Sequence, residues 1–166
     1  MAPQTVDIAL KDGRTGKTPL YIQLIDKIKS LPIVLQVNTQ FYNSGSQLAF
    51  DGSTVTQGSV DFLTGQVDNL IQGAKLDPSM VTIGLPTNFN AAGDGKINTG
   101  YVENEVIAQA LDCLVSGSNC GKYTPKGKYA NFGGVMGFSM NWDAFADNVF
   151  AKGVGSKLQE LKKRLN

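Results

Sequence analysis

Apolar residues follow two alternating patterns along this chain, which predict alternating helices and strands. Helical spacing of apolar residues recurs in four segments, residues 19–30, 59–73, 102–115 and 156–165. Short runs rich in apolar and β-branched side chains occur in three others, residues 33–40, 80–85 and 133–140. Residues 43–58 and 87–99 are polar and predict loops. Helices that alternate with apolar strands are typical of an α/β fold with a parallel sheet.

The predicted strands share amide, hydroxyl and aromatic residues at their carboxyl ends. These residues are Gln40, Phe41, Tyr42 and Asn43, then Pro86, Thr87 and Asn88, then Asn141, Trp142 and Asp143. In parallel sheets, the carboxyl ends of the strands are where ligands bind. Such groups suit neutral, hydroxyl-rich ligands, and Trp142, the only tryptophan, offers a flat surface for a sugar ring. A core tryptophan followed by a turn explains the same segment equally well.

Composition limits the range of functions. The 166 residues suit one domain, and 42% hydrophobic against 17% charged residues indicates a globular chain. A net charge of +1 argues against a nucleic-acid partner, and no apolar run reaches the ~18 residues that span a bilayer. Histidine is absent, which excludes Ser-His and Cys-His catalysis and most zinc sites. We expect no cofactor and no metal.

Two short motifs have competing explanations. Cys113 and Cys120 enclose six residues rich in Gly, Ser and Asn, which favours a local disulfide and an oxidising compartment. Two free thiols are the alternative. Residues 13–18 are similar to a phosphate-binding loop, but only two residues separate the glycines where the motif requires four. We therefore do not expect nucleotide binding.

Three segments at the predicted strands resemble glycoside hydrolase family 18, the bacterial and fungal chitinases. Residues 36–45, QVNTQFYNSG, resemble the family's sixth strand, which in the chitinase D-like branch has the pattern QVQxYNSGS. Residues 81–86, VTIGLP, resemble the seventh strand, IGLPA. Residues 134–143, GVMGFSMNWD, resemble the eighth strand, GVMTWSINWD. The three motifs occur in the family's order.

Two further segments extend the resemblance. Residues 1–4, MAPQ, resemble the end of the family's fifth strand, and Cys113 with residues 120–123 resembles a loop of some relatives. Family 18 enzymes are (β/α)8 barrels. The resemblance therefore implies that residues 1–150 form the second half of a barrel, from the end of strand five to strand eight. Residues 151–166 are expected to form a basic tail helix with a solvated charged face.

The resemblance also implies roles for the residues at the strand ends. Family 18 catalysis is substrate-assisted, because the N-acetyl carbonyl of the sugar attacks its own anomeric carbon. Tyr42 would donate to that carbonyl, Trp142 would form the floor of the subsite, and Gln40 and Asn43 would line it. Met1 and Asn141 complete the predicted substrate-binding set. Tyr42 as a packed strand-end tyrosine and Met1 as barrel packing are the alternatives.

The carboxylate residues of this chain do not match the catalytic carboxylates of the family. The family's general acid is the last Glu of a DxxDxDxE motif on the fourth strand, and no segment of this chain matches that motif. Glu103 and Glu105 lie on a predicted helix and do not replace it. Asp143 is expected to cap the helical turn that follows it rather than to act in catalysis. We therefore expect the chain to be inactive alone.

The resemblance finally implies partners and a compartment. Chitin or chito-oligosaccharides would be the ligand, and the parent protein would be secreted. Residues 1–3 lack the character of a signal peptide, so the chain would begin after the signal. A half barrel exposes strand edges, so we expect self-association or pairing with the missing N-terminal half. A non-catalytic carbohydrate-binding protein and a self-assembling structural protein are the alternative functions.

Overall fold

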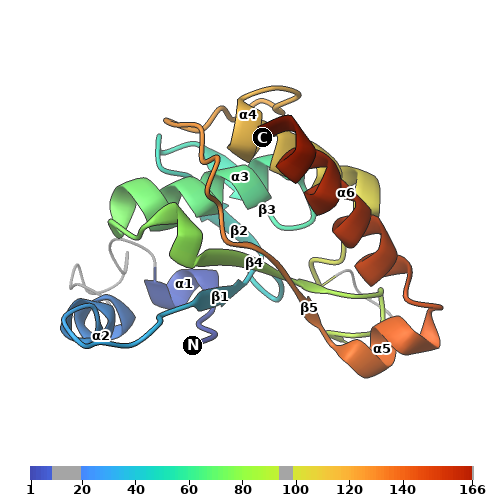
Figure 1. Cartoon of the computed structure of the whole chain (residues 1–166), viewed down its shortest axis with the longest axis horizontal. Coiled ribbons are helices and arrows are strands. Elements are labelled where there is room, and N and C mark those ends of the chain that lie inside the picture. Colours follow the sequence, from blue (N-terminus) through green and yellow to red (C-terminus); the bar gives the residue numbers. More distant parts are fainter. Residues whose placement is uncertain (9–19, 94–98, 166) are drawn as a thin grey trace.

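A parallel sheet in the order β1–β4–β5 lies at the centre of the molecule (Figure 1). Its strands are β1 (Val37–Gln40), β4 (Val81–Pro86) and β5 (Gly134–Phe138). This computed structural model describes residues 1–8, 20–93 and 99–165, so the phosphate-loop-like residues 13–18 lie outside the described residues. Val37 lies beside Val81 and Thr82 beside Gly134. The predicted parallel α/β arrangement is confirmed.

The N-terminal residues run alongside β1 on the side away from β4. The Asn38 N–H donates to the Met1 carbonyl at 2.9 Å, and the Gln40 N–H donates to the Pro3 carbonyl at 2.8 Å. A parallel bridge pairs Gln4 with Gln40. Four parallel segments therefore lie side by side in the order in which they occur along the chain.

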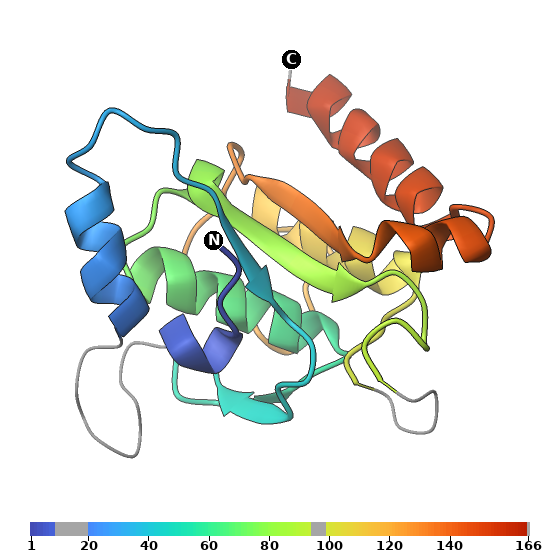
Figure 2. The same ribbon diagram turned by 90° about the horizontal axis from the view of Figure 1, so that it is seen from below.

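Helices cover one face of this sheet. The helices are α1 (Thr5–Ile8), α2 (Leu20–Ile28), α3 (Val60–Asp68), α4 (Asn104–Ser116), α5 (Met140–Phe145) and α6 (Val149–Leu165). Phe41 packs edge-on against Phe62 of α3, with ring centroids 6.2 Å apart. In Figure 2 the sheet lies in front of α3 and α4, and among the described residues no helix crosses its near face. The sheet therefore has one covered face and one open face.

The first predicted strand is shorter than expected. The chain over residues 33–36 is not a strand, and Val34 is 99% exposed. The reason is that β4 begins at Val81, opposite Val37, so the residues before Val37 have no neighbouring strand to pair with. β-branched composition alone does not make a strand.

The predicted loop over residues 43–58 contains a hairpin instead. Its strands, β2 (Ser46–Leu48) and β3 (Thr54–Thr56), pair antiparallel. At the turn, the Asp51 carboxylate accepts from the Ser53 N–H at 2.9 Å. Strands of three residues carry too little alternation to be recognised from sequence.

Two further element boundaries differ from the prediction. The strand predicted over residues 133–140 ends at Phe138, and Met140 begins α5. The helix predicted to begin at Ser156 begins at Val149, because two glycines in its first turns hid the helical pattern. The predicted domain boundary after residue 150 falls inside α6. Val154 and Leu161 of that helix are buried in the same core as the sheet.

The other predicted helices and strands agree with the structure. The helix predicted over residues 59–73 forms α3, which continues as a π-helical turn, Asn69–Gly73. A short 3-10 turn, Pro78–Met80, precedes β4. Cys113 and Cys120 form a disulfide, as predicted, between the last turn of α4 and the loop that follows. In the described segments, no helix combines the length and apolar character that crossing a membrane requires.

Candidate functional site

Two aromatic rings meet where the parallel strands end. Tyr42 lies two residues beyond β1, and Phe138 is the last residue of β5. Their rings stack, with centroids 5.7 Å apart and planes inclined by 25°. The register places Gln40 beside Gly84 and Phe138 beside Pro86, so the two rings approach one another across the end of β4. Tyr42 is 6% exposed and Phe138 is 44% exposed, so this pair presents one open aromatic face to solvent.

Tyr42 is suited to donate a hydrogen bond. Burial raises the pKa of its phenol above the ordinary value. A phenol with a raised pKa remains protonated throughout the neutral range. The Tyr42 hydroxyl therefore keeps its proton at any physiological pH.

The loop between β4 and α4 supports Tyr42 and Asn43 from behind. The Asn43 N–H donates to the Thr99 carbonyl at 2.6 Å, and its side-chain amide donates to the Ala92 carbonyl at 3.2 Å. Gly100 has φ +110°, and a Cβ there would lie 2.8 Å from the Tyr42 Cα. Only glycine fits at this position. The Asn43 amide group thus holds a loop in place.

Gln40 and Met1 lie at the junction between β1 and the N-terminal segment. The Gln40 side-chain amide donates to the Ala2 carbonyl at 2.9 Å. The Met1 ammonium donates to the Gln36 carbonyl at 2.9 Å, and the Met1 side chain packs against the core. Gln40 lies at the strand end that carries Tyr42, whereas Met1 lies beside the start of β1. Their predicted contact with substrate stays a prediction.

Trp142 and Asn141 lie on α5 rather than on the strand end where we expected them. Trp142 packs edge-on against Phe145, with ring centroids 5.9 Å apart. Its carbonyl accepts from the Asn88 side-chain amide at 3.1 Å. Asn141 is exposed and hydrogen-bonds the Ser139 hydroxyl. The aromatic residue at the end of the last strand is therefore Phe138, which the sequence prediction overlooked.

The family pattern contained the signal for Phe138. When GVMTWSINWD is placed on residues 134–143, its first tryptophan falls on Phe138 and its second on Trp142. Trp142 is the chain's only tryptophan and drew the prediction to α5, although Phe138 lies four residues earlier. Phe138 rather than Trp142 lies at the strand end, because β5 ends at Phe138 and α5 begins at Met140.

Asp143 caps α6, as predicted. Its side chain is buried, and its two carboxylate oxygens accept from the N–H groups of Phe150 and Ala151 at 3.0 and 3.1 Å. These groups belong to the first turn of α6, where a carboxylate also interacts favourably with the helix dipole. Both carboxylate oxygens of Asp143 are therefore hydrogen-bonded to the backbone of α6.

The described residues hold no cluster that resembles a metal site. Among them, no three His, Cys, Asp or Glu side chains are arranged to hold a metal ion. The chemistry available at the strand ends is that of a phenol donor, side-chain amides and an open aromatic face. These groups orient and hold a neutral polar ligand.

The comparisons identify relatives of one class. No family model matches the chain. A protein of Arthroderma benhamiae described as a probable class II chitinase is 33% identical over 165 residues, covering 89% of this chain and 47% of the relative. A structure described as a chitinase A from Streptomyces coelicolor matches with a TM-score of 0.82 and 39% identity, over 96% of this chain and 50% of that one. A family GH18 chitinase from Chromobacterium violaceum matches with a TM-score of 0.80 and 26% identity, over 96% of this chain and 44% of that one.

These matches and the strand-end site define an α/β protein related to glycoside hydrolases. The chain is a homologue of the glycoside hydrolase family 18 chitinases. It spans half or less of the length of these three relatives.

Proposed function

We propose that this chain is the C-terminal half of a family 18 (β/α)8 barrel, and that its strand ends hold an N-acetylglucosamine unit of chitin. The N-terminal segment, β1, β4 and β5 would be strands five to eight. Four parallel segments in chain order support this assignment, because successive strands of such a barrel are neighbours. The α6 helix would then complete the last (β/α) unit.

The stacked pair of Tyr42 and Phe138 is the observation that carries the proposal. A sugar has apolar C–H faces that pack on a flat aromatic ring, and Phe138 offers a half-exposed ring at the strand ends. The protonated Tyr42 hydroxyl beneath it would donate to the acetamido carbonyl. We therefore assign the floor of the subsite to Phe138. Trp142, on α5, would contact the ligand from the rim.

These residues would position the substrate's own nucleophile. In the substrate-assisted reaction, the acetamido oxygen attacks the anomeric carbon while an acid protonates the leaving oxygen. Holding the acetamido group in place contributes through orientation and through preorganised hydrogen bonding. The chain's sequence has no DxxDxDxE motif to supply the acid. We therefore propose that the chain alone binds the saccharide without cleaving it.

Binding of chitotetraose to the purified chain, followed by NMR titration, tests the proposal. We expect shifts of the resonances of Tyr42 and Phe138, and no such shifts with cellotetraose, which has hydroxyls in place of the acetamido groups. Equal shifts with both sugars, or none with either, would overturn the assignment. Release of chromophore from a chitobiose derivative by the chain alone would show that the acid is present after all.

The disulfide supports a secreted parent protein as part of the same proposal. Disulfides persist in oxidising compartments, and Cys113–Cys120 joins α4 to a loop that packs on α3. In that loop, the Tyr123 N–H donates to Asp61 at 3.0 Å. Thiol labelling of the protein isolated from culture medium checks this. Full labelling of both cysteines without reductant would contradict it.

A further inference from the structure

The turn directly after Tyr42 is closed by the side chain of Gln57, which follows the hairpin. Asn43 and Gly45 both have positive φ, 54° and 64°, so the backbone turns sharply there. The N–H groups of Ser44 and Gly45 both donate to Gln57 Oε1, at 2.6 and 2.9 Å. The Gln57 N–H donates in return to the Gly45 carbonyl at 2.9 Å. The left-handed region costs free energy for a residue with a Cβ, so this turn depends on the bonds that hold it.

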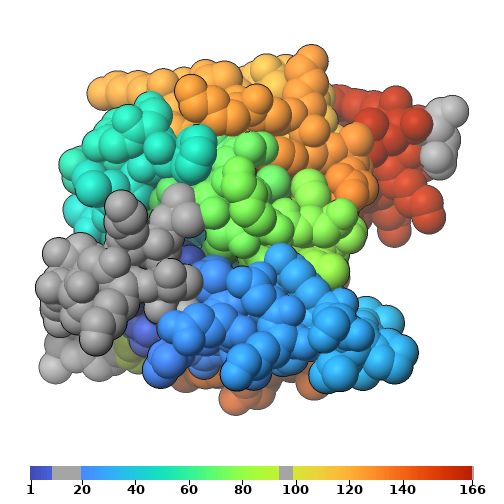
Figure 3. Space-filling view, turned by 90° about the vertical axis from the view of Figure 1, so that its left-hand side faces the viewer, coloured from blue at the N-terminus to red at the C-terminus, as the bar shows by residue number. Residues whose placement is uncertain are grey.

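Gln57 is carried by a hairpin that is fixed to α3 and to the π-helical turn after it. It directly follows β3, at the base of the hairpin. The Leu48 carbonyl of β2 accepts from the side-chain amides of Gln66 and Asn69 at 3.0 and 2.8 Å. The hairpin forms the turquoise patch at the upper left of Figure 3. Gln57 therefore reaches the turn after Tyr42 from a support that is itself anchored to a helix.

A series of hydrogen bonds restrains Tyr42 in a second way. The Gln47 side-chain amide donates to Thr5 Oγ1 at 2.9 Å, and the Thr5 hydroxyl donates to Ser44 Oγ at 3.0 Å. The Ser44 hydroxyl then donates to the Tyr42 carbonyl at 3.0 Å. Thr5 is 2% exposed, and hydrogen bonds in a series that is shielded from water strengthen one another. Ser44 is therefore bonded through its N–H to Gln57 and through its hydroxyl to Tyr42.

These bonds act on the chain around Tyr42 rather than on its ring. They end on the Tyr42 carbonyl, on Ser44 and on the Gly45 N–H. The Tyr42 hydroxyl is the outermost atom of its side chain, so a small rotation of the backbone moves it further than it moves the Cα. Hydrogen bonds weaken steeply when donor and acceptor lose alignment. Apolar contact of a sugar with Phe138 depends less on direction. Loss of the restraint is therefore expected to impair the hydroxyl first.

We propose that Gln57 is a positioning residue for Tyr42, and that it directs the Tyr42 hydroxyl at the acetamido carbonyl of the sugar. This assignment rests on the proposed function of Tyr42. Gln57 does not contact the ligand and acts through the turn at Ser44 and Gly45. Sugars with an N-acetyl group are the class that depends on it, because that group provides the acceptor for Tyr42. General support of the fold is the competing explanation.

Isothermal titration with chitotetraose in a double-mutant cycle tests the proposal. Gln57→Leu removes the acceptor and keeps a side chain of similar size. We expect it to weaken binding about threefold in the wild-type background, within the roughly fivefold loss expected for Tyr42→Phe. In the Tyr42→Phe background we expect a further loss of less than about 1.5-fold, because the hydroxyl that Gln57 directs is already missing. A loss of equal size in both backgrounds would overturn the assignment.

Two further glutamine variants are matched to Gln57→Leu. Gln57→Glu keeps an oxygen that accepts from Ser44 and Gly45, and a charged acceptor forms the stronger bonds. We therefore expect it to bind chitotetraose within about twofold of the wild type. Gln72→Leu makes the same exchange in the π-helical turn, where the glutamine amide donates to the Tyr129 hydroxyl at 3.2 Å, and we expect its affinity to be unchanged. An equal loss in Gln57→Glu and Gln57→Leu would contradict the acceptor role.

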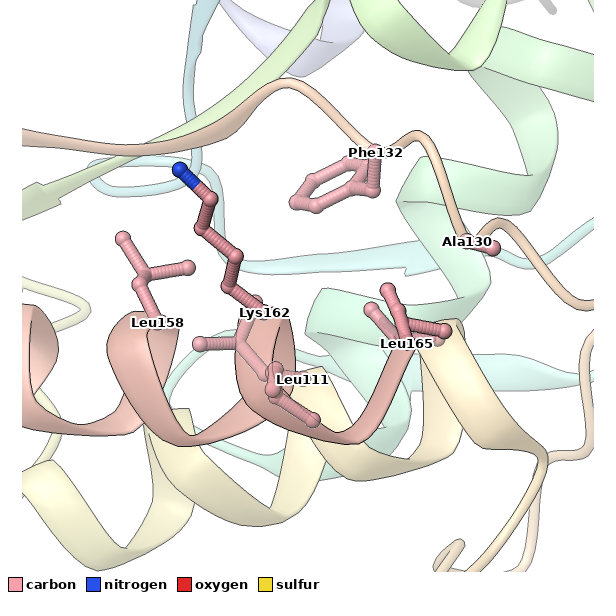
Figure 4. Close-up of a pocket in the computed structure, with 8 residues that line it drawn as sticks. Leu111, Ala130, Phe132, Leu158, Lys162 and Leu165 are labelled. Carbon is pink, nitrogen blue, oxygen red and sulfur yellow. The ribbon is translucent and has the colours of Figure 1, made fainter.

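A destabilising substitution far from Tyr42 separates positioning from general stability. One side of α6 lies open beside the segment that leads into β5, at a pocket of about 250 Å³ lined by Ala130, Phe132 and Leu158 (Figure 4). That segment precedes β5, whereas Phe138 is the last residue of the strand. Leu158→Ala is expected to lower Tm by about 4–8 °C and to leave chitotetraose affinity unchanged. If it weakens binding as much as Gln57→Leu does, lost stability explains both effects and the assignment is wrong.

A measurement without sugar separates this assignment from the proposed function. The rings of Tyr42 and Phe138 lie 5.7 Å apart, so nuclear Overhauser contacts between them are expected in the wild type and in Gln57→Glu, and weaker contacts in Gln57→Leu. Unchanged ring contacts in Gln57→Leu would overturn the assignment, whether or not the chain binds chitotetraose. Weakened contacts in that variant, with no chitotetraose binding by the wild type, would leave the positioning standing and the proposed function wrong. If Gln57→Leu does not fold, Ser44→Ala takes its place in both measurements, and the same outcomes decide.

Discussion

Tyr42 and Phe138 stack with ring centroids 5.7 Å apart, although they lie at the ends of strands that are not neighbours. β4 lies between β1 and β5 and ends at Pro86, beside Phe138. The ring of a proline cannot fill the space that a long side chain would occupy. The two aromatic rings therefore approach across the end of the central strand, and the pair becomes the most prominent feature of the strand ends.

The stacked pair predicts which substitutions weaken sugar binding. Phe138→Ala removes the exposed ring, and loss of one aromatic contact worth about 1.4 kcal/mol weakens chitotetraose binding about tenfold. Tyr42→Phe removes one hydroxyl donor and is expected to weaken binding about fivefold. Isothermal titration with chitotetraose measures both effects.

Phe50→Ala is the matched control for Phe138→Ala. Phe50 is also aromatic and is 36% exposed, but it lies in the turn between β2 and β3. We expect the affinity of this control variant for chitotetraose to match that of the wild type. A larger loss for Trp142→Ala than for Phe138→Ala would return the floor of the subsite to Trp142.

Gly100→Ala is expected to destabilise the fold and to disturb Tyr42. Gly100 has φ +110°, and a Cβ would lie 2.8 Å from the Tyr42 Cα. The strain and the clash together are expected to cost about 2–3 kcal/mol. Urea unfolding measures the loss. Gly155→Ala is the control, because nothing lies within 4 Å of its Cβ position, and we expect it to stabilise α6 by about 0.5–1 kcal/mol.

Asp143→Ala should weaken the start of α6. The substitution removes the acceptors for the Phe150 and Ala151 N–H groups, which lie at 3.0 and 3.1 Å. Because the site is buried, we expect a loss of about 1–2 kcal/mol in the free energy of unfolding. Asp26→Ala, at an exposed residue paired with Lys29 at 3.6 Å, is expected to change it by less than about 0.5 kcal/mol. Equal effects of the two substitutions would contradict the capping role.

Alkaline pH is expected to unfold the protein through Tyr123 and Tyr129. Both phenols donate to the buried Asp68 carboxylate, Tyr123 at 2.5 Å. Burial, and next the hydrogen bond to Asp68, raise the pKa of both phenols above the ordinary tyrosine value of 10.0. The folded state therefore keeps protons that the unfolded chain releases, so this stabilisation is complete below about pH 10 and falls as the pH rises further.

Urea midpoints between pH 8 and 11 measure the alkaline effect. The double substitution Tyr123→Phe and Tyr129→Phe is expected to lower stability at neutral pH, because Asp68 loses two donors. It is also expected to flatten the decline above pH 10. If stability falls as steeply above pH 10 in the double variant as in the wild type, other groups cause the alkaline loss of stability.

The long, strongly patterned elements could be predicted from the sequence, and the short ones could not. The prediction was right for α3 and α4, because their apolar faces extend over several turns. It was right for β4 because this strand is buried on both faces. The hairpin of β2 and β3 was missed because strands of three residues show no clear period. The first turns of α6 were missed because Gly153 and Gly155 have low helix propensity.

The candidate site was predicted in part. The placement of Tyr42, Gln40 and Asn43 at the end of one strand followed from the polar residues after an apolar run. The side-chain amide of Asn43 turned out to hold the loop at Ala92, a contact across 49 residues that no local pattern contains. Phe138 was missed because its importance depends on where β5 ends, which the partner strand sets.

The sequence by itself determined the alternation of helices and strands, the disulfide between Cys113 and Cys120 and the resemblance to family 18. These depend on residue types and on spacing over short distances. Only the tertiary structure decided that Phe138, and not Trp142, stacks on Tyr42, and that one side of α6 lies open beside β5. Both outcomes depend on strand register and on which surfaces remain without a neighbour. Such relationships are set by packing between segments far apart in the chain.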